Sequence, residues 1–190
     1  MRAFSILSLI LFAAAPAFAQ SVPPTAPIDL VGARASLTGA WEGDLEYRDY
    51  TADKWFGIPV KTRIADQGDG ATTIRSSDFD DGPKIGNVRI TSVELFDAVA
   101  GTVSVGNFRK GRSAEITTYA IRLDPASRDA RSWTVIEEAM GKDDDRPATL
   151  RLTTVRDGDQ LETLKEVDFL DDQAQEWLAR NRTRLTRTGN

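Results

Sequence analysis

From residue 37 onward, this chain is a succession of short runs in which apolar and polar residues alternate, with turn residues between the runs. In the first run, Trp41, Leu45 and Tyr47 share one phase, and charged residues occupy the other. Successive side chains of a β-strand point to opposite faces, so each run predicts a strand with one apolar and one solvated face. About nine or ten such strands, with no convincing long helix, predict an all-β barrel or sandwich.

Two segments depart from simple alternation. Val88 and Ile90 share one phase, whereas Val93 and Leu95 share the other. A change of phase within one strand predicts a β-bulge near residues 91–92. Residues 174–184 contain good helix formers, but the residues after them alternate like a strand, so this segment is either a helix or part of the last strand.

The first nineteen residues have the features of a secretory signal peptide. Arg2 makes the start basic, residues 6–15 form an apolar run, and Ala17-Phe18-Ala19 has the small-x-small pattern of a cleavage site. We therefore expect cleavage between Ala19 and Gln20, and a protein that is periplasmic or secreted. The apolar run is too short to span a membrane.

The segment after the signal peptide differs from the rest of the chain. Residues 20–36 contain three prolines and little periodicity, which predicts a flexible leader with a short helical turn at 28–34. Residues 37–190 are the right length for a single domain with its own core. The chain contains no cysteine, so this domain is not stabilised by disulfides.

Composition restricts the chemistry that this chain can perform. The absence of histidine excludes Ser-His and Cys-His catalytic arrangements, His-ligated haem and the common catalytic zinc sites. A net charge of -5 disfavours nucleic acids and anionic membranes as partners. Acidic clusters at residues 78–81 and 143–145 lack the spacing of a calcium loop. We expect no metal, no cofactor, no nucleic acid and no stable membrane anchor.

A tryptophan at the start of the first strand predicts how a barrel would close. Gly39 precedes Trp41 by two residues and would let the large ring fold over the opening. In the last run, Arg187 is the one cation in phase with Thr183 and Leu185. We therefore expect its guanidinium to stack on the indole of Trp41 as a cation–π pair.

These residues carry a family resemblance. Gly39-Ala40-Trp41 on the first strand, with Arg187 near the end of the last, resembles the calycin superfamily of lipocalins and fatty-acid-binding proteins. The stretches WEGDLEYRDY and RNRTRLTR are also similar to a group of exported bacterial lipocalin-like barrels. The resemblance implies an antiparallel up-and-down β-barrel of about 8–10 strands that encloses a small apolar or amphipathic molecule.

Phase identifies candidate ligand-binding residues inside such a barrel. They are the inward-facing aromatic and aliphatic side chains and one lysine: Tyr47, Phe56, Ile58, Tyr119, Phe169 and Lys165. An inward Lys165 would suit a carboxylate head group; alternatively, it lies near the strand end and extends to water. On the strand at residues 132–140, either Glu137 or Glu138 must also face inward. That glutamate would form an ion pair or stay an isolated acid of raised pKa.

Three functions agree with these features. The first is passive binding of a small molecule inside the barrel, with no catalysis. The second is an envelope interaction module or inhibitor whose barrel is filled by its own side chains. The third is a histidine-free isomerase or lyase, which would need an inward glutamate of raised pKa beside a tyrosine, inside a cavity.

Overall fold

The computed structural model describes residues 27–172, 174 and 176–189. The expected signal peptide therefore lies outside the described residues. Apart from one short helix, α1 (Leu30–Ala35), the described elements are antiparallel strands. The strands are β1 (Gly39–Asp49), β2 (Lys54–Asp66), β3 (Thr72–Asp80), β4 (Asn87–Asp97), β5 (Thr102–Arg109), β6 (Glu115–Leu123), β7 (Ser132–Asp143), β8 (Arg146–Asp157), β9 (Gln160–Phe169) and β10 (Leu178–Gly189).

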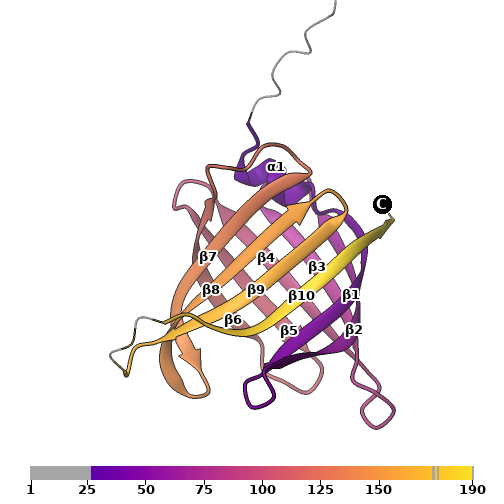
Figure 1. Ribbon diagram of the computed structural model, residues 1–190. Helices are drawn as coiled ribbons and strands as arrows, with labels where there is room; N and C mark the ends of the chain where they lie inside the picture. The colour runs from indigo at the N-terminus through magenta and orange to yellow at the C-terminus, as the bar shows by residue number, and fades with distance from the viewer. Residues whose placement is uncertain (1–26, 173, 175, 190) are drawn as a thin grey trace, which may run out of the picture.

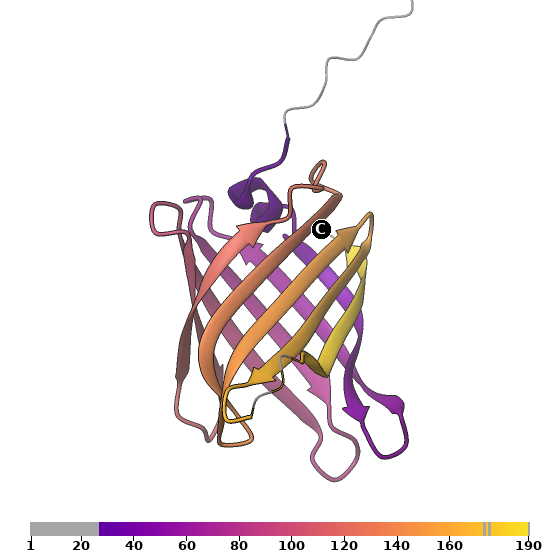
Figure 2. The same ribbon diagram turned by 60° about the vertical axis from the view of Figure 1, so that its left-hand side comes forward.

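The strands form one closed barrel. Each pairs with its neighbours in the sequence, and β1 pairs with β10 to complete the ring. Figures 1 and 2 show the strands tilted around a common axis, with α1 at one end. The expected antiparallel up-and-down barrel is confirmed. β10 begins at Leu178, so the second half of segment 174–184 is strand and not helix.

The predicted bulge in β4 is wrong. β3 and β4 pair without a shift from Thr72↔Leu95 to Asp80↔Asn87. Val93 and Leu95 therefore stay on the outer face, where both are exposed. Ser92 and Glu94 point inward instead, because this part of the barrel interior is polar.

The end of segment 20–36, where the sequence predicts a short helical turn at 28–34, forms α1 (Leu30–Ala35) and packs against the barrel. Asp29 caps α1 by accepting a hydrogen bond from the backbone N–H of Gly32 at 2.7 Å. Ala33 and Arg34 are buried against the barrel. A helix of this length is not stable alone, so its contacts with the barrel hold it in place.

Trp41 closes the barrel beneath α1. Its side chain is fully buried, and its indole N–H donates to the Leu37 carbonyl at 2.8 Å. The structure brings Arg187 to this ring, with its guanidinium carbon 4.6 Å from the ring centroid. The same guanidinium donates to the carbonyls of Ser36 and Thr38, both at 2.8 Å. Arg187 therefore joins the last strand to the chain that enters the first.

The glycine two residues before Trp41 is required by the backbone. Gly39 has a φ of 138°, which L-residues rarely adopt. A Cβ there would lie 2.6 Å from the Gly189 carbonyl oxygen and 2.7 Å from Nη1 of Arg187. A side chain at position 39 would therefore displace the arginine that covers Trp41.

Replacement of the closing tryptophan should destabilise the fold. We expect Trp41→Ala to lower the free energy of unfolding by about 3 kcal/mol or more, because a fully buried ring is lost. Urea denaturation followed by fluorescence measures this change. Trp55→Ala is the matched control, since Trp55 lies beside Arg48 and Arg182 and is only partly buried. A loss below about 1 kcal/mol for Trp41→Ala would contradict its role in closure.

Candidate functional site

A cavity of about 240 Å³ lies inside the barrel, next to α1. One part of its wall is polar, with side chains from α1, β3, β4 and β5 that include Arg34, Arg75 and Glu94. The remaining wall carries apolar side chains such as Val135 and Leu152. Such a mixture of apolar surface and a few polar groups is typical of small-molecule sites.

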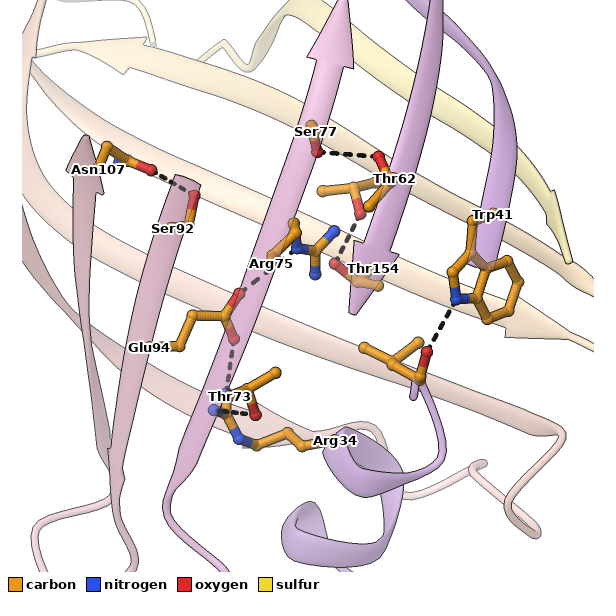
Figure 3. A network of polar contacts seen from close by, with 12 residues as sticks. Arg34, Trp41, Thr62, Thr73, Arg75, Ser77, Ser92, Glu94, Asn107 and Thr154 are labelled. Carbon is orange, nitrogen blue, oxygen red and sulfur yellow. Dashed lines mark hydrogen bonds and ion pairs between the residues drawn. The ribbon is translucent and has the colours of Figure 1, made fainter. Parts of the chain in front are cut away.

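Two arginines share one carboxylate in this cavity. Nη1 of Arg34 lies 3.1 Å from one oxygen of Glu94, and Nε of Arg75 lies 3.6 Å from the other. Arg34 also donates to the hydroxyl of Thr73 at 3.1 Å. Figure 3 shows the two guanidinium groups meeting Glu94 from different directions. The side chains of Arg34 and Glu94 are only 8% and 14% exposed, so water screens this cluster weakly.

Glu137, and not Glu138, faces the cavity. Burial, and secondarily the negative charge of Glu94, raises the pKa of Glu137 to about 7. Arg75 and Arg34 act in the opposite direction and offset part of this increase. Burial, and then the nearby Glu137, also raises the pKa of Tyr119, which lines the same cavity.

Hydroxyl groups supply further hydrogen-bonding positions. On one side the hydroxyl of Ser92 donates to the side-chain oxygen of Asn107 at 2.7 Å. On the other side the hydroxyls of Thr154 and Thr163 lie 3.0 Å apart. All four residues line the cavity, so a ligand there meets polar groups on opposite walls.

Of the six candidate ligand-binding residues, Tyr119 lines this cavity. The strand directions place most of the others nearer the opposite end of the barrel. There the rings of Tyr47 and Phe56 stack with centroids 5.6 Å apart, next to Ile58 on β2, and Phe56 is 56% exposed. Phe169 is buried beneath Arg146, whose guanidinium carbon is 3.7 Å from the ring centroid.

Lys165 faces inward but already has an acidic partner. Its Nζ donates to Asp143 at 2.7 Å. Arg180 contacts the second oxygen of the same carboxylate, also at 2.7 Å. The lysine therefore belongs to an ion-pair cluster at the end opposite α1, and it lies outside the cavity next to the helix.

Sequence reasoning did not find the charged cluster of Arg34, Arg75 and Glu94. Arg34 lies in the segment that the sequence predicts as a flexible leader, and Glu94 follows the predicted bulge, so neither is a candidate for the barrel interior from the sequence alone. A signal for Arg75 was present, because it shares the phase of Thr73 and Ser77, both of which are buried.

The described residues contain no group of three or more acidic, histidine or cysteine side chains that could hold a metal ion. Asp78 of the first acidic cluster instead accepts two hydrogen bonds from Arg89. No helix among residues 27–189 that the structure describes has the length and apolar character needed to cross a membrane.

Comparisons with known proteins give the fold but no family. No protein-family model matches the chain, and no curated protein matches it. A solved structure with a similar fold is the crystal structure of Rv2717c from M. tuberculosis. It is 14% identical, with a TM-score of 0.56, and the match covers 83% of this chain and 96% of that chain. At this identity the similarity concerns the fold alone.

The raised pKa of Glu137 should make stability depend on pH. Because this pKa increases from 4.5 to about 7 on folding, the folded state binds an extra proton between these values. The contribution of Glu137 to the free energy of unfolding therefore falls as pH rises through this range, and it levels off above it. In Glu137→Gln this loss disappears. Between pH 4.5 and pH 8, the free energy of unfolding of the variant should therefore increase by up to about 3 kcal/mol relative to that of wild type.

Urea denaturation of both proteins at the two pH values measures this difference. Glu138→Gln is the matched control, because it removes a carboxylate from the outer face of the same strand. The control should follow the wild-type pH dependence. A Glu137→Gln difference that is the same at both pH values would contradict the assignment.

Proposed function

We propose that this protein is exported and binds a small amphipathic molecule in the cavity next to α1, without transforming it. The observation that carries this proposal is a cavity of about 240 Å³ inside the barrel, whose lining combines charged and hydroxyl groups with apolar side chains. Ligand pockets of drug-sized molecules have volumes of about 300–1,000 Å³. The ligand is therefore smaller than most of these molecules.

Two sequence features support the finer parts of the proposal. Residues 1–19 support export to the periplasm or beyond. The glycine and tryptophan of the first strand, together with Arg187 of the last, support membership of the calycin superfamily. Members of that superfamily hold small molecules inside the barrel, which agrees with the position of the cavity.

The cavity favours this function over a filled barrel that acts only through its surface. Side chains of a filled barrel would occupy the space beside Arg75, Glu94 and Glu137, whereas these residues border a cavity. An interior that leaves several charged groups around unfilled space costs stability, and such departures from ideal packing are expected mainly at functional sites.

A second candidate is an enzyme that uses Glu137 for proton transfer. It is favoured by one observation, the carboxyl group of raised pKa beside Tyr119 in the same cavity. A general acid or base works best when its pKa lies near the operating pH. A molecule converted by wild type but not by Glu137→Gln would favour the enzyme. A molecule recovered unchanged would favour the binding protein.

Native mass spectrometry tests the binding function. Wild-type protein purified from its own periplasm, then exposed to the small-molecule extract of the same cells, should carry a molecule that is released on denaturation. Val105→Trp should lose this molecule, because Val105 lines the cavity and a larger ring would fill it. The molecular mass of the released compound identifies the ligand class.

The control is Ser104→Trp, which places the same ring on the outer face of β5, where Ser104 bonds Thr118 in an exposed position. This variant should retain the molecule. A ligand-free mass for the wild type after exposure, or equal retention by Val105→Trp, would overturn the proposal. Circular dichroism of both variants establishes that they are folded.

A further inference from the structure

We infer that the cavity selects a small organic molecule with a single negative charge, and that Glu137 takes up a proton when this anion binds. The inference rests on the proposed binding function and names its ligand class. It follows from the number and arrangement of the charged groups that surround the cavity.

The charges of the cavity lining balance only when Glu137 is ionised. Its lining contains two guanidinium groups, Arg34 and Arg75, and two carboxyl groups, Glu94 and Glu137. When Glu137 is protonated, the lining carries one net positive charge. When it is ionised the charges are equal, but a second carboxylate is then enclosed near Glu94. Both states are unfavourable, because an unpaired buried charge and two close like charges each cost free energy.

The positions of the two arginines leave one of them available to a ligand. Arg34 is held on both sides, by Glu94 at 3.1 Å and by the Thr73 hydroxyl at 3.1 Å. Arg75 lies 3.6 Å from Glu94, which exceeds the usual length of a hydrogen bond. A guanidinium has five N–H donors in a planar fork that matches a carboxylate. Arg75 is therefore the group on which an anion docks.

Glu137 makes this docking depend on protons. The cavity-lining side chains from β5, β8, β9 and β10 are uncharged. The titratable and charged groups that face Glu137 come from four other elements: Arg34 from α1, Arg75 from β3, Glu94 from β4 and Tyr119 from β6. An anion beside Arg75 adds a further negative charge near Glu137. Its arrival favours the protonated form, which can also donate a hydrogen bond to the ligand.

A neutral Glu137 and a bound monoanion give a lining of zero net charge. Anion and proton therefore bind together, and each strengthens the binding of the other by the same factor. A neutral ligand of the same shape leaves the positive charge of the lining uncompensated. Selection of the anion over its neutral analogue therefore depends on Arg75 and Glu137 together.

Calorimetric titration with benzoate, acetate and the neutral analogue benzamide tests this inference. Benzoate should bind wild type up to about tenfold more tightly at pH 6 than at pH 8, because binding is linked to about one proton. Benzamide should bind more weakly and without this pH dependence. Near pH 8, titrations in two buffers of different ionisation enthalpy should show uptake approaching one proton per benzoate.

Two variants separate the roles of the residues. Glu137→Gln should bind benzoate with little pH dependence and no proton uptake, since an amide does not titrate. Arg75→Met should lose the preference for benzoate over benzamide, whereas Arg75→Lys should keep it because the charge remains. Thermal melting of each variant establishes that it is folded, and Glu137→Gln provides a test even where Arg75→Met is unstable.

Each contrary result has a distinct meaning. Equal binding of benzoate and benzamide, or benzoate binding that is independent of pH in wild type, would overturn the anion inference and leave the proposed binding function intact. The anion inference would also be overturned if neither benzoate nor acetate binds while native mass spectrometry detects an uncharged molecule in the cavity. The proposed binding function would again remain intact. The proposed function itself is overturned only by two mass-spectrometry outcomes, a ligand-free wild type or equal retention by Val105→Trp.

Discussion

The closure of β1 against β10 is the constraint on which the rest of the structure depends. Arg187, on the last strand, donates to the carbonyls of Ser36 and Thr38 just before the first strand begins. Arg156 of β8 donates to the same Ser36 carbonyl, and Trp133 of β7 donates to the Ser36 hydroxyl at 3.1 Å. Three strands thus hold the short connection between α1 and β1.

This connection also builds the candidate site. α1 ends at Ala35, directly before the held residue Ser36, so fixing the connection fixes the helix. Arg34 then reaches across the barrel to Glu94, 60 residues away in the sequence. The residues that close the barrel therefore set the position of one of the two arginines in the cavity.

The barrel and its closure could be predicted because both depend on local patterns. Alternation between two faces marks each strand, and the glycine before Trp41 marks the entry of the first one. The polar cluster could not be predicted in the same way. Charged residues are almost never buried without partners, so a glutamate in an alternating run does not by itself indicate an inward position. The inward position of Glu94 follows from the unshifted pairing of β3 and β4 and from Arg34 and Arg75 beside it.

The two ends of the barrel use similar groups differently. At the end opposite α1, Lys165 and Arg180 contact Asp143, and Arg180 also contacts Asp144. Asp144 is 70% exposed, and the two cations and two carboxylates of this cluster balance. Next to α1 the fourth group is Glu137, whose pKa is raised to about 7 by burial and by the negative charge of Glu94. The first cluster pairs its cations with carboxylates of the chain, whereas the second is the one for which we infer a further charge from a ligand.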